Sequence, residues 1–132
     1  MTESKNLIEV KDMKIHFQQK GGKVVKAVDG ITFSIRKGET FGIVGESGCG
    51  KSTLGRGILR LIEPTEGKVF YNGRDMSTMS DKEMKELRQK IQIIFQDPSA
   101  CLNPRRTMKQ ILMEPFRVHG IKDKEFVENR IR

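Results

Sequence analysis

Residues Gly45 to Ser52 read G-E-S-G-C-G-K-S, and this stretch fits the pattern G-x-x-x-x-G-K-S. Glycine lets a loop curl so tightly that its backbone N–H groups converge, and convergent donors suit the several negative charges of a phosphate chain. In this pattern the lysine, Lys51, reaches the β- and γ-phosphates, and the hydroxyl of Ser52 ligates the Mg²⁺ that accompanies them. The stretch therefore predicts a phosphate-binding loop, or P-loop.

The segments on either side of the loop have the required character. Thr40 to Val44 is a short apolar run that predicts a strand, and Ser52 to Ile62 places apolar residues at helical spacing. The loop holds no ordinary side-chain N-cap, so the first N–H groups of the helix and the positive end of its dipole would face a bound phosphate. The predicted nucleotide-binding residues are Gly45, Glu46, Ser47, Gly48, Cys49, Gly50, Lys51, Ser52 and Thr53.

The length and composition predict one soluble domain of ordinary size. The chain has 132 residues, of which 36% are hydrophobic, and it carries a net charge of +8. Such a charge could indicate binding of nucleic acid. Basic and acidic residues alternate, however, as in Asp81 to Glu86, and the chain has a single tyrosine that could stack on a nucleobase. We therefore expect no nucleic-acid partner, while a basic surface beside an anionic membrane remains open.

Other classes are excluded by what the sequence lacks. Cys49 and Cys101 stand alone, without the paired spacing of zinc ligands or of a disulfide framework. No apolar stretch is long enough to span a bilayer, and the start from Met1 to Lys5 is polar, unlike a signal peptide. A cytoplasmic location is the expectation.

The residues before the loop predict an antiparallel layer of strands. Leu7 to Phe17 alternates between apolar and polar residues, with an interruption near Asp12. Val24 to Val28 and Ile31 to Ile35 predict two more strands, and Asp29-Gly30 between them is a typical hairpin turn.

The residues after the loop alternate between strand and helix. Lys68 to Tyr71 predicts a strand. Ser80 followed by Glu83 predicts a capping box at the start of a helix that runs to about Gln89. Ile91 to Phe95 then predicts a second strongly buried strand beside the nucleotide.

The last part of the chain predicts helices. Gln96-Asp97-Pro98 ends the preceding strand, and a polar loop continues to Arg106. Thr107 with Gln110 caps the next helix, which Pro115 should kink or end. From Asp123 the pattern is helical again.

This order of segments resembles the ATP-binding subunit of an ABC transporter, and the local sequence is similar to that of the oligopeptide and dipeptide importers. The likeness is carried by V-K-A-V-D-G at residues 25–30, by Lys51-Ser52-Thr53, and by I-F-Q-D-P at 94–98 with L-N-P-R at 102–105. It implies an α/β fold: a partial P-loop NTPase core with an N-terminal antiparallel β layer, over residues 1–96, and the beginning of a helical subdomain, over 97–132.

The resemblance also implies roles for residues outside the loop. Phe17 would stack on adenine, although it is otherwise unremarkable as the last core residue of its strand. Gln96 would reach Mg²⁺ together with Ser52, and the loop from Gln96 to Arg106 would dock onto transmembrane permease subunits. The implied cofactors are ATP and Mg²⁺, the implied partner is a second ATP-binding subunit, and the implied place is the inner face of the cell membrane, where the subunit energises peptide import.

Three features of that family are absent from this sequence: the signature L-S-G-G-Q, a Walker B strand ending in Asp-Glu, and a switch histidine. Neither His16 nor His119 stands where the switch histidine would. The likeness therefore covers only the N-terminal half of such a subunit, we predict no catalytic residue, and ATP hydrolysis by this chain remains open. A half-sheet leaves unpaired edges, so we expect self-association.

Two other classes remain as alternatives. A small P-loop kinase could use Asp97 as its Mg²⁺ carboxylate, but only two segments look like buried parallel strands, and a doubly wound core needs more. The other alternative is a non-catalytic fragment that binds a membrane or a partner subunit through its helical tail.

Overall fold

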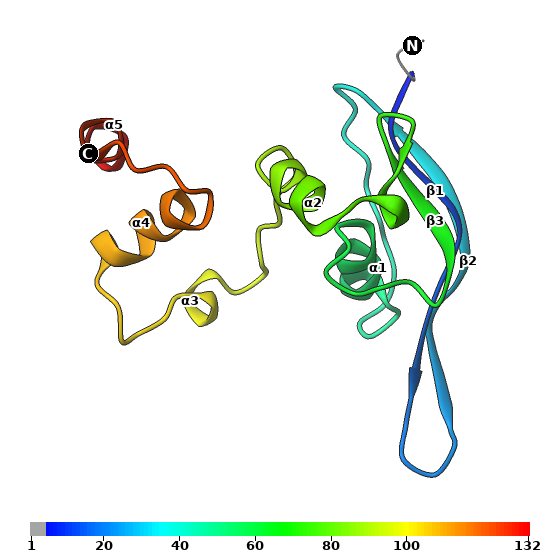
Figure 1. Ribbon diagram of the computed structural model, residues 1–132. Coiled ribbons are helices and arrows are strands. Elements are labelled where there is room, and N and C mark those ends of the chain that lie inside the picture. Colours follow the sequence, from blue (N-terminus) through cyan, green and yellow to red (C-terminus); the bar gives the residue numbers. More distant parts are fainter. Residues whose placement is uncertain (1–4) are drawn as a thin grey trace. The chain divides into compact units, whose positions relative to one another are not determined.

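The computed structural model describes residues 5–132, so most of the polar start at residues 1–5 lies outside the description (Figure 1). The chain forms two compact units, one up to Ile91 and one over Gln92–Arg132. The elements of the first unit are β1 (Asn6–Gln18), β2 (Val24–Arg36), α1 (Lys51–Ile58), β3 (Glu66–Tyr71), β4 (Arg74–Asp75), a 3₁₀ turn (Met76–Thr78) and α2 (Asp81–Leu87). Those of the second are α3 (Pro98–Cys101), α4 (Met108–Val118) and α5 (Lys124–Ile131).

The sheet of the first unit is antiparallel and has four strands in the order β2-β1-β3-β4. β1 is paired along both edges: its register with β2 runs from Asn6 opposite Arg36 to Gln18 opposite Val24, and β3 pairs with its other edge. The antiparallel layer expected from the sequence is therefore confirmed.

The hairpin turn predicted at Asp29-Gly30 is wrong. β2 runs unbroken through both residues, and the chain reverses instead at residues 19–23, where the Gln19 N–H donates to the Lys23 carbonyl at 2.8 Å. Gly30 is an extra residue in the register against β1, with φ of +80°, so it forms a β-bulge. Asp-Gly supplies the positive φ that a hairpin turn needs, but a bulge uses the same conformation, and pairing on both sides decides between them.

The interruption predicted near Asp12 is a second bulge rather than a strand end. Asp12 has φ of +47°, and the register against β2 shifts between Val10 and Met13. The Asp12 N–H donates to the hydroxyl of Thr32 at 2.9 Å, so the bulged residue is still tied to the neighbouring strand.

The core of the first unit lies on the face of the sheet against which α1 packs (Figure 1), and α2 contributes Met84 and Leu87 to it. A Cβ on Gly57 would lie 2.5 Å from Cδ1 of Ile15, so glycine at this position lets α1 approach β1 closely. Arg60 closes the far end of α1 by donating to the carbonyls of Met76 and Met79 at 3.0 and 2.9 Å. The buried residues that form this core are Ile8, Val10, Met13, Ile15, Val28, Leu54, Val69, Met76, Met79, Met84 and Leu87.

The two strands predicted for a parallel core, Thr40 to Val44 and Ile91 to Phe95, are not strands in the structure. Val44 is 98% exposed and Ile94 is 92% exposed. A strand of this kind exists only when neighbours complete its hydrogen-bond ladder and cover both of its faces, and the described residues provide no such neighbour. The helix after the P-loop is also shorter than predicted, because α1 ends at Ile58.

The second unit is helical. The capping box of Thr107 and Gln110 opens α4 as predicted, but Pro115 does not end the helix, which continues to Val118. The short helix α3, with Asp97 as N-cap and Pro98 in its first turn, falls where the sequence predicted a loop. Phe116 and Phe126 join α4 to α5 edge to face, with ring centroids 6.3 Å apart. Among residues 5–132 no helix has the length and apolarity needed to cross a membrane.

Candidate functional site

The P-loop lies at the end of the long connection between β2 and α1 (Figure 1). The chain turns where the Cys49 N–H donates to the Glu46 carbonyl at 3.3 Å. Gly50 has φ of +93°, and a Cβ on it would lie 2.1 Å from the carbonyl oxygen of Ala27, so no other residue fits here without movement of β2. The end of the loop is thus held against β2. No local sequence pattern indicates that Ala27 forms this wall, because the contact is made only when the sheet folds.

Lys51 lies inside the curl of the loop. Its Nζ donates to the carbonyls of Gly45 and Glu46 at 2.7 and 2.6 Å and lies 3.4 Å from Sγ of Cys49. An ammonium group has three donors, so these contacts fix its direction. The arrangement places a full positive charge at the centre of a loop whose glycines leave room for an anion.

The N-terminus of α1 adds donors beside that charge. Its N-cap is Gly50, which supplies no side-chain cap, and its first turn holds no acidic residue. The first backbone bond of the helix is from the Leu54 N–H to the Gly50 carbonyl at 2.8 Å. The N–H groups of Lys51, Ser52 and Thr53 therefore have no acceptor within the helix, and with the helix dipole they favour an anion. The uncapped start predicted from the sequence is confirmed.

The described residues provide few ligands that could bind a metal ion in the absence of a nucleotide. No group of three or more His, Cys, Asp or Glu side chains within residues 5–132 is arranged to hold a metal. Ser52 is exposed in the first turn of α1, next to Lys51, and its hydroxyl suits a cation that brings most of its oxygen ligands from phosphate and water. Gln96 is exposed and belongs to the second unit, so its pairing with Ser52 stays a prediction.

Phe17 lies near the end of β1, opposite Val25 of β2, and its ring is partly exposed. It is therefore not a core residue, and its stacking on adenine stays a prediction. Its neighbour His16 bonds through Nε2 to Oδ1 of Asp29 at 2.9 Å, and Lys26 approaches the same carboxylate at 3.5 Å. The hydrogen bond with His16 is the main reason that the pKa of Asp29 lies below its ordinary value.

Asp97 caps the N-terminus of α3 in the second unit. Its Oδ1 accepts from the Ser99 N–H, the Ser99 hydroxyl and the Ala100 N–H at 3.1, 2.9 and 3.2 Å. The hydrogen bond from the Ser99 hydroxyl is the main cause that lowers the pKa of this carboxyl, followed by those from the backbone. Capping of α3 thus accounts for Asp97 without a metal ion, which disfavours the kinase alternative.

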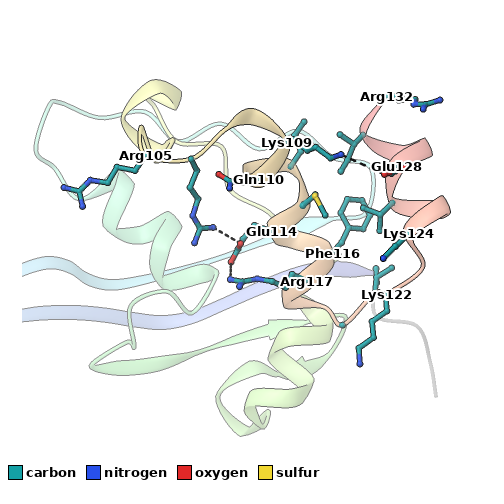
Figure 2. Close-up of a pocket in the computed structure, with 17 residues that line it drawn as sticks. Arg105, Lys109, Gln110, Glu114, Phe116, Arg117, Lys122, Lys124, Glu128 and Arg132 are labelled. Atoms are coloured by element: carbon teal, nitrogen blue, oxygen red, sulfur yellow. Dashed lines mark hydrogen bonds and ion pairs between the residues drawn. The ribbon is translucent and has the colours of Figure 1, made fainter.

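A groove lies between α4 and α5, within the second unit (Figure 2). Glu114 in its wall accepts from Arg106 at 2.7 Å and from Arg117 at 2.6 Å, and these contacts, that with Arg117 first, lower the pKa of the glutamate. The floor is apolar, and most of the charged side chains around it are basic: Arg105, Arg106, Lys109, Arg117, Lys122, Lys124 and Arg132.

The sequence pattern of one protein family, described as "ABC transporter", matches residues 28–131, which include the whole P-loop and both helices of the groove. This chain belongs to that family. The match covers more than half of the chain, and the P-loop geometry agrees with it.

Curated relatives and solved structures agree with this membership. The oligopeptide transport ATP-binding protein AppF of Bacillus subtilis is 51% identical over 122 residues, which are 87% of this chain and 37% of AppF. The oligopeptide transport ATP-binding protein OppF of Salmonella typhimurium is 46% identical over 137 residues, which are 97% of this chain and 41% of OppF. The chain therefore spans about two fifths of the length of these relatives.

The solved dimeric structure of MJ0796, a bacterial ABC transporter cassette, superposes with a TM-score of 0.79 at 28% identity and covers 93% of this chain and 53% of the cassette. A second dimeric structure of the same cassette, in a post-hydrolysis state bound to ADP and Pi, gives a TM-score of 0.78 at 28% identity. The fold predicted from the sequence, a partial ABC ATPase fold, is confirmed.

Proposed function

We propose that the chain is the ATP-binding part of an ABC transporter subunit that energises peptide import. The observation that carries this proposal is the P-loop, in which the Lys51 ammonium and the uncapped start of α1 converge on one exposed curl. The two oligopeptide transport relatives named above support the choice of peptides as the solute.

In this proposal the chain's own groups bind and orient the nucleotide. The N–H groups of residues 45–53 and the Lys51 ammonium bind the phosphates, and Phe17 offers its exposed ring to the adenine. Ser52, with Gln96, would hold the Mg²⁺, which neutralises phosphate charge when it is bound. The described residues contain no cluster of acids that would hold the metal and activate a water, so we expect binding without turnover by the chain alone.

The proposed partners follow from the same assignment. The loop from Gln96 to Arg106 would dock onto transmembrane permease subunits, and a second ATP-binding subunit would face the nucleotide. The proposed place is the inner face of the cell membrane, and no nucleic acid is involved. The residues of α3 and of the loop around it are exposed, which supports this docking role.

The test is a titration of the purified chain with Mg-ATP. The Lys51→Ala variant should bind at least about tenfold more weakly, because a charge-assisted hydrogen bond is worth roughly 1.5–3 kcal/mol. Lys23→Ala, in the exposed turn between β1 and β2, is the matched control and should bind as the unmodified chain does. Equal binding by all three proteins would contradict the P-loop assignment.

Two further measurements make the test more specific. Cys49 is exposed in the loop, so a thiol reagent should label it quickly, and Mg-ATP should slow this labelling. Cys101, which is also exposed but belongs to the second unit, serves as the internal reference. The rate of phosphate release from Mg-ATP should be the same for the unmodified chain and for Lys51→Ala. Clear turnover by the chain alone would contradict the expectation of binding without hydrolysis.

A further inference from the structure

Strands β1 and β2 continue past the end of β3 as a two-stranded arm, residues 17–25 (Figure 1). β3 pairs with β1 no further along than Lys14. The backbone N–H of His16 donates to the hydroxyl of Thr65 at 2.9 Å, so His16 is the last residue of β1 that is held on both edges. From Phe17 onward, β2 is the strand that pairs with β1 among the described residues.

A β-bulge lies where the arm leaves the sheet. The residues of β1 opposite Val28 and Lys26 are consecutive, so Ala27 is an extra residue of β2. A bulge bends its strand, and this one therefore sets the direction in which the arm leaves the sheet. Ala27 also lies against the P-loop, because its carbonyl oxygen would be 2.1 Å from a Cβ on Gly50. The direction of the arm relative to the P-loop is thus determined at this bulge.

The side chains of His16 and Asp29 connect the two sides of the bulge. Asp29 lies on the sheet side, and its Oδ1 is 2.9 Å from Nε2 of His16, which lies on the arm side. Lys26, also on the arm side, approaches the same carboxylate at 3.5 Å. The His16 side chain is only 18% exposed, so its bond is partly shielded from water. The bond restricts the bend of the arm at the bulge.

Phe17 is the residue whose position depends on this bend. Successive side chains of a strand point to opposite faces, so Phe17 shares a face with Ile15 while His16 points to the other face. Ile15 packs against α1, because a Cβ on Gly57 would lie 2.5 Å from its Cδ1. The ring of Phe17 is therefore on the face of the strand that carries α1, the helix that begins in the P-loop. A fixed His16 keeps this ring on the nucleotide side.

We propose that His16 and Asp29 are positioning residues for nucleotide binding, because their bond holds the arm so that Phe17 can stack on the base. The inference rests on the proposed function, in which Phe17 contacts adenine. It goes further by naming the pair that holds the ring in place. It also predicts that a proton on His16 strengthens the binding of the base.

The charge of His16 determines the strength of the bond. An imidazole ordinarily changes its charge between about pH 5 and pH 8. The hydrogen bond with His16 is the main reason that the pKa of Asp29 lies below its ordinary value, so this carboxylate is charged throughout that range. Protonated His16 then forms an ion pair, whereas neutral His16 keeps only a hydrogen bond. The binding of the base should therefore weaken as the pH rises and His16 loses its proton.

Three other charged groups face this pair. Lys14 of β1 and Glu66 of β3 form an ion pair with each other at 2.7 Å, and Lys26 of β2 shares the carboxylate of Asp29. Lysine and glutamate side chains ordinarily keep their charges between about pH 5 and pH 8, so they contribute a constant background. The imidazole is the group of this cluster whose charge changes in that range.

The test compares binding of Mg-ATP and of Mg-tripolyphosphate to the full chain by calorimetry. Tripolyphosphate offers phosphates to the P-loop but has no base, so the ratio of the two affinities reports the contribution of the base. Stacking of a base on an aromatic ring is worth about fivefold or more in affinity. His16→Ala and Asp29→Ala should therefore each lower the ratio about threefold or more and leave the binding of Mg-tripolyphosphate unchanged.

Two further variants separate positioning from a general loss of structure. His16→Gln places an amide donor near the position of Nε2, so it should restore most of the ratio and remove its pH dependence. In the unmodified chain the ratio should fall about twofold from about pH 5.5 to pH 8, because a partly exposed ion pair adds little to a hydrogen bond. Glu66→Gln is the matched control: it breaks the ion pair with Lys14, which does not cross the bulge, and should change the ratio less than about 1.5-fold.

Several results would overturn the proposal. One is a ratio that His16→Ala and Asp29→Ala leave unchanged, or that Glu66→Gln lowers equally. Another is an equal loss of Mg-ATP and Mg-tripolyphosphate binding, which would mean that the pair only stabilises the fold. A pH dependence that persists in His16→Gln would assign it to another group and overturn the role of the His16 proton.

The same measurements distinguish this inference from the proposed function. If the unmodified chain binds Mg-ATP more tightly than Mg-tripolyphosphate but the variants of the pair do not change the ratio, the proposed function stands and this inference fails. Equal binding of the two by the unmodified chain would remove the role of Phe17, and this inference with it, but keep the P-loop. Binding of neither would contradict the proposed function itself.

Discussion

β1, which alternates between apolar and polar residues, and the apolar segment Thr40 to Val44 are both predicted as strands, and they end in opposite states. β1 is paired along both edges and buries Val10, Met13 and Ile15 almost completely. The second segment lies in the same unit, yet its Val44 is almost fully exposed. The difference teaches that an apolar run becomes a strand only when the chain also supplies the neighbours that complete its ladder.

The capped helices repeat this lesson. α2 and α4 each begin with a complete capping box, Ser80 with Glu83 and Thr107 with Gln110. α2 buries Met84 and Leu87, whereas α4 buries none of its residues among those described. Local hydrogen bonds start both helices, but packing onto a core stabilises only the first.

The largest expected effect is a difference in the free energy of unfolding between a variant in the paired strand β1 and a variant at Ile94, which lies in an unpaired segment. Ile15→Ala should lower the free energy of unfolding by about 2–5 kcal/mol, because it removes a 1% exposed side chain and leaves a cavity beside Gly57. Ile94→Ala, at a 92% exposed residue, should change it by less than about 0.5 kcal/mol. Urea unfolding followed by circular dichroism measures both, and equal losses would break the comparison.

The second largest effect is a difference in stability between variants of the two capping boxes. Ser80→Ala should lower the stability of the first unit by about 1 kcal/mol, because α2 is part of its core. Thr107→Ala should instead reduce the helical signal of α4 and leave the main unfolding transition in place. Amide hydrogen exchange resolves the two outcomes, since it reports each helix separately. A shared loss in both units would show that they unfold together.

The features predicted well from the sequence are those decided by neighbours along the chain. The capping boxes and the uncapped start of α1 depend on a few adjacent residues. Asp29-Gly30 was misread because a turn and a bulge use the same positive φ, and only pairing with β1 distinguishes them. Thr40 to Val44 is not a strand because no strand that would pair with it lies among residues 5–132.

The candidate site divides in the same way. Residues 45–53 are contiguous, so the motif alone brings together the loop donors, Lys51 and the start of α1. The wall that Ala27 forms behind Gly50 depends on the folded sheet, and no local pattern indicates it. Gln96 lies in the other unit, so its role depends on an arrangement that sequence spacing does not determine.

The smallest expected effect is a pH dependence within the capping box of α2. Glu83 accepts from the backbone N–H of Ser80 at 2.8 Å, pairs with Arg74, and accepts from the Ser80 hydroxyl at 2.9 Å. These contacts, the backbone bond first, lower the pKa of Glu83 from 4.5 to about 2. A lowered pKa means that the unfolded chain binds the proton more readily, so the contribution is complete above pH 4.5 and is lost as the pH falls toward 2.

Replacement of Glu83 by glutamine tests this directly. Glu83→Gln keeps an acceptor for the Ser80 N–H but removes the charge that pairs with Arg74, so it should be less stable than the unmodified chain at pH 6. The difference should shrink steadily between about pH 4.5 and pH 2.5, because protonated glutamate and glutamine then offer similar groups. Glu86→Gln, on the same helix but outside the box, is the control and should show a small difference throughout. Urea midpoints at each pH provide the measurement, and a difference that stays constant down to pH 2.5 would mean that the charge of Glu83 does not stabilise the start of α2.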